Sequence, residues 1–253
     1  ATSFELKDGT VDIILSGTGV LNKTTGGTVT LNNKNTYTGA TTVTAGKLQY
    51  GTSDAIAGGT VTVNGTTAEL ASGGYSDTVG TVTLDGGGRI SGTGKLTSTS
   101  SFEMKSGVVD AMLGGAGIAL NKTSSGTVTL NNQNTYTGLT SVTAGKLAYG
   151  TNNAIASGAV TVDGPGTELA LDGYSDTVGT VTLDHGGLIS GTGKLTSTGS
   201  FEVKDGTVNA VLDGADIALN KTSSGTVTLN NQNTYTGLTS VTAGKLAYGT
   251  NNA

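Results

Sequence analysis

The sequence contains no cysteine and no tryptophan, and its 253 residues include one proline, one histidine and only 4% aromatic residues. Without cysteine the chain has no disulfide, no thiolate metal ligand and no thiol nucleophile. No apolar run is long enough for a transmembrane helix, and no signal peptide is visible. We expect the chain to be a segment of a longer protein, with any export signal or membrane anchor outside this segment.

Charge is also scarce, with 12% charged residues, a formal net charge of −5 and a single arginine, Arg89. Nucleic-acid binding needs clustered lysine or arginine, so the composition disfavours that partner. The 43 glycines follow no Gly-X-Y period, which excludes collagen. Abundant valine, leucine, isoleucine and alanine favour a narrow core filled by small branched side chains.

The strongest pattern is an internal repeat of about 99 residues, and repeats of this kind decide the architecture before any motif is considered. The phrase NTYTG recurs at this period, and residues 118–154 and 217–253 are identical. We assign one continuous segment, 1–253, with internal repeats at approximately 4–101, 102–200 and 201–253. A unique active site is unexpected in such an array, because every surface is repeated. The landmarks are Tyr37, Tyr136 and Tyr235, together with Phe4, Phe102 and Phe201.

Short alternating segments such as TVTL indicate β-strands, with valine and leucine facing the core and the threonines facing solvent. Within one repeat they are centred near Val128, Val160, Val181, Phe201 and Val227, and each of the four unequal intervals is similar to one coil of a solenoid. We therefore predict an all-β fold, a right-handed parallel β-helix (β-solenoid) with about four coils per repeat. The alternative is a row of antiparallel sandwich domains, against which stand the missing tryptophan and the near-absence of proline. The TVTL-like segments are 28–31, 60–63, 81–84, 127–130, 159–162, 180–183 and 226–229.

One stretch, 126–150, resembles the autotransporter-associated β-strand repeat, also called the passenger-associated transport repeat. The match rests on Gly126, Val128, Leu130, Asn134, Tyr136, Gly138, Thr140, Val142, Gly145 and Leu147, and the motif recurs at 27–51 and 225–249. The resemblance implies a β-helical passenger of a surface-exposed or secreted bacterial protein, many of which are adhesins. The near-uniform copies favour a long stalk or fibre. We expect a structural role for the motif residues Asn35, Tyr37, Gly39, Asn134, Tyr136, Gly138, Asn233, Tyr235 and Gly237.

No residue set predicts catalysis, a metal site or a cofactor. His185 has Gly86 as its counterpart, so we interpret it as a turn histidine in solvent. The repeated acids are interpreted as solvated surface residues, because no histidine or arginine accompanies them in each copy and they lie in different coils. Phosphate-loop spacing and calcium-binding nonapeptides are absent. The acids are Glu5, Glu103, Glu202, Asp77, Asp176, Glu69 and Glu168.

The prediction for function is a non-enzymatic structural or adhesive rod on the bacterial outer surface or outside the cell. Its expected partners are other copies of itself, a host or matrix surface and glycans, bound weakly at each repeat. Alternatives are a polysaccharide-binding or polysaccharide-degrading β-helix enzyme, and an ice-binding solenoid, which the uneven spacing of the strands disfavours. The candidate outward contact residues are Thr28, Thr30, Asn32, Asn33, Thr127, Thr129, Asn131, Asn132, Thr226, Thr228, Asn230 and Asn231.

Overall fold

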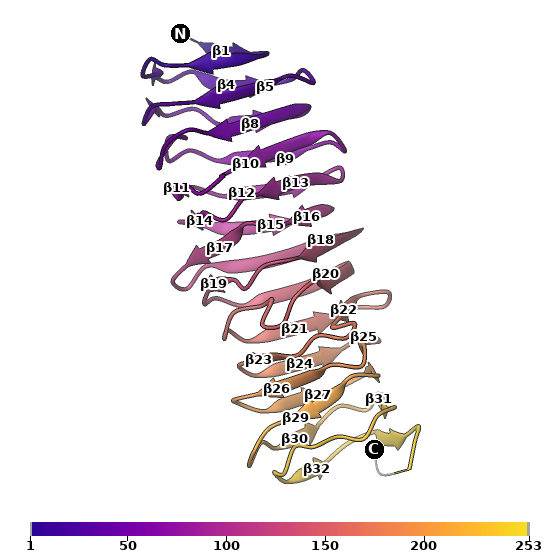
Figure 1. Cartoon of the computed structure of the whole chain (residues 1–253). Coiled ribbons are helices and arrows are strands. Elements are labelled where there is room, and N and C mark those ends of the chain that lie inside the picture. Colours follow the sequence, from indigo (N-terminus) through magenta and orange to yellow (C-terminus); the bar gives the residue numbers. More distant parts are fainter. Residues whose placement is uncertain (1, 252–253) are drawn as a thin grey trace.

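The computed structural model describes residues 2–251, and these contain β-strands and turns but no helix. The strands stack from the N-terminal to the C-terminal end like the steps of a ladder (Figure 1). Every recorded strand pairing is parallel, and each strand pairs with one from the coil before or after it. Parallel pairing through successive coils confirms the predicted β-helix and is incompatible with antiparallel sandwich domains.

Each coil contributes a strand to a first face of the solenoid, where thirteen strands lie one above another. Adjacent strands share the pattern of inward aliphatic and outward polar side chains that the sequence predicts. The first face consists of β1 (Ser3–Leu6), β4 (Val20–Lys23), β7 (Thr41–Val43), β9 (Val61–Asn64), β12 (Val82–Asp85), β15 (Ser101–Met104), the first part of β18 (Ala119–Leu130), the first part of β20 (Thr140–Tyr149), β21 (Val160–Asp163), β24 (Val181–Asp184), β27 (Phe201–Val203), β30 (Leu219–Lys221) and β32 (Thr239–Val241).

The second face follows in each coil and is equally continuous. Strands β18 and β20 bend from the first face to the second, with a register irregularity after Lys122. The second face consists of β2 (Gly9–Val11), β5 (Thr28–Leu31), β8 (Gly46–Tyr50), β10 (Ala68–Ala71), β13 (Gly88–Ser91), β16 (Gly107–Val109), the second parts of β18 and β20, β22 (Glu168–Ala170), β25 (Gly187–Ser190), β28 (Gly206–Val208), β31 (Thr226–Leu229) and β33 (Lys245–Tyr248).

The third face is shorter and is interrupted twice. It divides into three stacks that do not pair with one another. The interruptions fall where residues 51–60 and 150–159 form a loop in place of a strand. The stacks are β3 (Ser16–Gly17) with β6 (Thr36–Tyr37); then β11 (Asp77–Val79), β14 (Lys95–Ser98), β17 (Met112–Gly115) and β19 (Thr135–Tyr136); then β23 (Asp176–Val178), β26 (Lys194–Ser197) and β29 (Val211–Asp213).

Each repeat contains five coils, so the prediction of about four was wrong. The TVTL strands at 28–31, 127–130 and 226–229 lie on the second face, whereas those at 60–63 and 81–84 lie on the first. The two longest intervals between successive alternating segments therefore connect strands on different faces. Each of these intervals spans about one and a half coils. At about 4.8 Å per coil, one repeat rises roughly 24 Å. The register of the first face passes in five steps from Phe102 through Leu120, Thr140, Val160 and Val181 to Phe201.

The core is a narrow column of aliphatic side chains with one aromatic pair per repeat. The ring centroids of Phe102 and Tyr136 lie 5.9 Å apart with an interplanar angle of 54°. The pairs Phe4–Tyr37 and Phe201–Tyr235 have the same separation. Such tilted pairs add stability beyond their buried area, about 0.5–1.5 kcal/mol each. These pairs include six of the eleven aromatic residues of the sequence.

Candidate functional surface

The asparagine of the repeat motif connects three successive coils on the third face. The side chain of Asn134 is 7% exposed, and its Oδ1 accepts a hydrogen bond from the Leu113 amide at 2.7 Å. Its Nδ2 donates to the carbonyl of Ala154 at 2.6 Å and to that of Asn132 at 3.2 Å. Asn35 makes the same set of contacts. The asparagine side chain thus replaces the backbone hydrogen bonds between strands, because the following coil has a loop instead of a strand at this position.

The tyrosine of the motif packs in the core, and the glycine of the motif allows neighbouring coils to approach closely. The hydroxyl of Tyr136 hydrogen-bonds the Thr140 hydroxyl at 2.9 Å, and burial raises the pKa of this tyrosine. A Cβ at Gly138 would collide with the backbone of Ile118 in the previous coil. Only glycine allows that approach, because the obstructing atoms belong to the main chain. Gly39 stands equally close to the carbonyl of Gly19.

Three buried lysines, which sequence reasoning missed, lie at the turn between the first and second faces. Lys23, Lys122 and Lys221 are 0% exposed. The Nζ of Lys122 donates to the carbonyls of Ser124 and Ala144, the latter at 2.8 Å. Burial lowers the pKa of Lys122 to about 8. The ammonium group therefore supplies hydrogen bonds to turn carbonyls that have left the strand ladder.

The predicted contact residues lie on the second face and on the turn that follows it. In each copy the first threonine is exposed and the second is half-buried. The first asparagine of each pair is exposed, but it also bonds to the preceding coil. Those bonds run from Asn32 to Asp12 at 2.6 Å, from Asn131 to Asp110 at 2.7 Å and from Asn230 to Asn209 at 2.8 Å. Each of these asparagines therefore ties its own coil to the preceding one.

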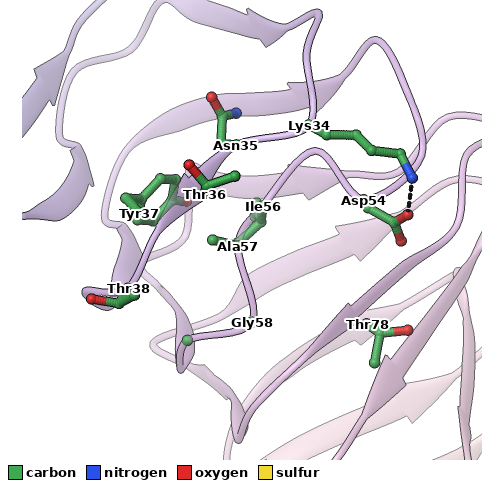
Figure 2. Close-up of a pocket in the computed structure, with 11 residues that line it drawn as sticks. Lys34, Asn35, Thr36, Tyr37, Thr38, Asp54, Ile56, Ala57, Gly58 and Thr78 are labelled. Carbon is green, nitrogen blue, oxygen red and sulfur yellow. Dashed lines mark hydrogen bonds and ion pairs between the residues drawn. The ribbon is translucent and has the colours of Figure 1, made fainter. Parts of the chain in front are cut away.

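A groove opens at each interruption of the third face. The first has a volume of about 550 Å³, and Figure 2 shows its loop, with Ile56 and Ala57, between Thr36 and Thr78. Ile56 and Ala57 are buried, so the loop is recessed from the surface that the neighbouring strands define. The Nζ of Lys34 pairs with Asp54 at 2.6 Å beside the groove (Figure 2).

The groove recurs in the second copy with a different rim. Its volume there is about 430 Å³, and Gln133 and Asn153 take the places of the lysine and the aspartate. The two grooves are one repeat, or about five coils, apart. The first groove therefore has an ion pair on its rim, whereas the rim of the second has uncharged side chains and its lining includes Asp176.

Two of the repeated acids are buried, which corrects their interpretation as solvated surface. Asp77 and Asp176 are each 2% exposed. The carboxylate of Asp77 accepts hydrogen bonds from the amides of Ile56 and Thr78, both at 2.8 Å. The sequence carried a signal for this, because Asp77 has the same parity as the buried Val79 in the alternating strand β11.

The other acids remain at the surface in cross-coil contacts. Glu103 accepts from Asn121 at 2.8 Å, and Glu168 lies 3.5 Å from the Nζ of Lys146. Exposed His185 contacts Asp163 at 2.6 Å, and this bond raises the pKa of the imidazole. Within residues 2–251, no group of three or more histidine, aspartate or glutamate side chains is arranged to hold a metal ion.

The coils are evenly spaced, so the uneven spacing that was expected to disfavour ice binding is not found. Partners in neighbouring coils of the first face, such as Val61 and Val82, stand nearly the same number of residues apart throughout the rod. The pattern of outward residues is instead interrupted. The threonines of 60–62 are followed one coil later by those of 81–83, but the next coil presents Ser101 and Glu103. Paired threonines therefore occupy only two successive coils in this part of the repeat.

Comparison with known proteins agrees with this geometry. The model of the family named passenger-associated-transport-repeat matches at residues 21–49, 120–148 and 219–247. Each match includes a first-face strand with its buried lysine, the motif asparagine and the following second-face strand. The chain is therefore a parallel β-solenoid that carries three passenger-associated transport repeats.

Among curated proteins, the chain is similar to "Adhesin BmaC autotransporter" of Brucella suis biovar 1 (strain 1330). The two are 35% identical over 209 residues, which is 77% of this chain and 6% of the relative. The chain thus spans a small fraction of the length of the relative that it matches. No solved structure matches the chain. Across residues 2–251 there is also no helix that is long and apolar enough to cross a membrane.

Proposed function

We propose that this chain is part of the passenger of a bacterial autotransporter adhesin and acts outside the cell or on its surface as a non-enzymatic rod. The observation that carries the proposal is the repetition of one outward surface every five coils along an unbroken core. The similarity to a segment of an adhesin autotransporter supports the same conclusion.

The partners are a host or matrix surface, glycans on such surfaces, or other copies of the rod. A single repeat offers an exposed second-face threonine, and the first two repeats also offer a shallow groove; each of these makes a weak contact. Repetition at intervals of roughly 24 Å lets several contacts act together, so avidity exceeds the affinity of any one repeat. Asn32, Asn131 and Asn230 stabilise this surface through their cross-coil bonds.

The experiment uses beads coated with the purified chain and measures their attachment to mammalian cells, to extracellular matrix and to one another. The test variant replaces the exposed second-face threonines by lysine: Thr28→Lys, Thr127→Lys and Thr226→Lys. The matched control places the same three substitutions at the end of the first face: Thr44→Lys, Thr143→Lys and Thr242→Lys. All six side chains are exposed.

We expect attachment by the wild-type chain, a loss of at least about tenfold in the second-face variant, and little loss in the first-face control. Equal loss in both variants would show that added charge, and not the second face, controls attachment. Absence of attachment to every surface, including other coated beads, would refute the adhesive role and leave only that of a stalk.

A further inference from the structure

The interruptions of the third face contain a buried acid and a buried phenol that the proposed adhesive role does not use. Asp77 lies beneath the loop at 51–60, and Asp176 lies beneath the loop at 150–159. The only buried side-chain oxygens without a hydrogen-bond partner in residues 2–251 are the hydroxyls of Tyr50 and Tyr149. A buried hydroxyl without a partner is costly, so its presence at the same place in two repeats calls for an explanation.

Asp77 fixes the loop above it through a hydrogen bond. One carboxylate oxygen accepts from the amide of Ile56 at 2.8 Å, and the other accepts from Thr78. In the second repeat Asp176 accepts from Ile155 at 2.9 Å and from Thr177 at 2.7 Å. The loop is held from the other side by the motif asparagine, since Asn35 donates to the carbonyl of Ala55 at 2.6 Å. Ala55 and Ile56 are thus fixed between an amide and a carboxyl group.

We propose that Asp77 and Asp176 are proton-binding sites that lock the two recessed loops, and with them the two grooves, when the surroundings become mildly acidic. A protonated carboxyl group has one O–H donor, and the adjacent tyrosine hydroxyl can accept it. The other carboxyl oxygen keeps its amide donor. Proton uptake therefore removes a buried charge while the loop amide keeps its acceptor.

The charged and titratable neighbours support this assignment. Burial raises the pKa of Asp77 and of Asp176 to about 6 in each case. The groups around Asp77 are Tyr50 on the second face, Tyr37 in the coil above the loop, Asp54 in the loop, Lys34 across the groove and Lys95 at the start of β14, the strand below.

The second repeat separates burial from the effect of neighbouring charge. Around Asp176 lie Tyr149, Tyr136 and, in β26 below, Lys194, while Gln133 and Asn153 replace the charged rim pair. The pKa is raised to about 6 at both sites although only the first has Asp54 beside it. Burial at the interruption, and not the rim charge, therefore sets the response.

The direction of the pH dependence follows from the difference in the pKa of the carboxyl group between the open and the closed loop. In an opened loop the carboxyl group titrates near its ordinary value of 3.8, whereas in the closed loop it titrates near 6. Closure is favoured most fully below pH 4 and is progressively lost as the pH rises through 6. These values predict that the opening equilibrium increases about tenfold between pH 5 and pH 8.

The test is hydrogen exchange of the Ile56 and Ile155 amides between pH 5 and pH 8, corrected for the intrinsic dependence of exchange on pH. We expect the opening equilibrium of both amides to rise about tenfold. In the variant Asp77→Asn, Ile56 should lose this dependence while Ile155 keeps it, which makes the second repeat an internal control. Asp54→Asn, which alters an exposed acid in the same loop, should leave both responses in place.

A second measurement keeps the proposal open to refutation if Asp77→Asn does not fold. Carbon-13 NMR of the wild-type chain should show the carboxyl groups of Asp77 and Asp176 titrating near pH 6. Titration of both acids near pH 4, or amide opening that does not change with pH, would overturn the proposal. Neither result depends on whether the rod is adhesive.

Discussion

Replacing Asn134 by alanine should be the most damaging single change in the middle of the rod that leaves the hydrophobic core intact. The substitution leaves the Leu113 amide and the Ala154 carbonyl without their side-chain partner, and both lie in a buried setting. A buried group left without a hydrogen bond costs about 1–3 kcal/mol, so two such groups predict a loss of about 2–6 kcal/mol. Asn134→Asp should be nearly as harmful, because a carboxylate cannot donate to the Ala154 carbonyl.

The assay is urea unfolding of the purified chain followed by circular dichroism, combined with hydrogen exchange of the Leu113 amide to localise the effect. Gln133→Ala is the matched control, because Gln133 is the neighbour of Asn134 in the same turn and lies at the surface. Its unfolding free energy should stay within about 0.5 kcal/mol of wild type. If Asn134→Ala also stays within that range and Leu113 remains protected, the bridging role of the motif asparagine is refuted.

Gly39→Ala should lower the unfolding free energy by about 1–3 kcal/mol, because the added Cβ would meet the Gly19 carbonyl. Gly58→Ala is the control and should change the unfolding free energy little, because its Cβ would stand in open space. Equal effects of the two substitutions would contradict the close approach of Gly39 to the neighbouring coil. Asp163→Asn should lower the NMR titration midpoint of His185, because the bond to Asp163 raises the pKa of the imidazole. The stabilising contribution of His185 is present below pH 6.5 and is lost as the pH rises through this raised pKa. An unchanged midpoint would show that Asp163 does not hold the imidazole. Burial lowers the pKa of Lys122 to about 8. In urea titrations, the unfolding free energy of wild type relative to Lys122→Met should therefore rise between pH 8 and pH 10.5. A constant difference would argue against a desolvated ammonium group.

Period and alternation were sufficient to predict the parallel solenoid, because both are local properties of the sequence. They did not give the number of coils. Strands with the sequence TVTL occur on two faces, and alternation specifies which side chains point inward without specifying the face to which a strand belongs. Assigning 127–130 and 159–162 to one face led to four coils, whereas the register of the strands shows five.

The polar interior was harder to predict than the aliphatic core. Lys23 and Asp77 share the parity of Leu21 and Val79, so alternation places them inward, but a charged side chain at such a position suggests an exposed strand end. Their hydrogen-bond partners lie in the next or previous coil, as with Ala45 for Lys23 and Ile56 for Asp77. Contacts between residues so far apart in the sequence exist only after the coils have stacked.

The central claim, that each repeat adds one five-coil section to a continuous rod, is tested most directly by length. Chains with two, three and four repeats can be measured by electron microscopy and small-angle X-ray scattering. The length should increase by roughly 24 Å per repeat, which is five coils at about 4.8 Å, with no change in cross-section. An increment of only four coils, roughly 19 Å, or beads of separate domains joined by bends, would contradict the five-coil rod.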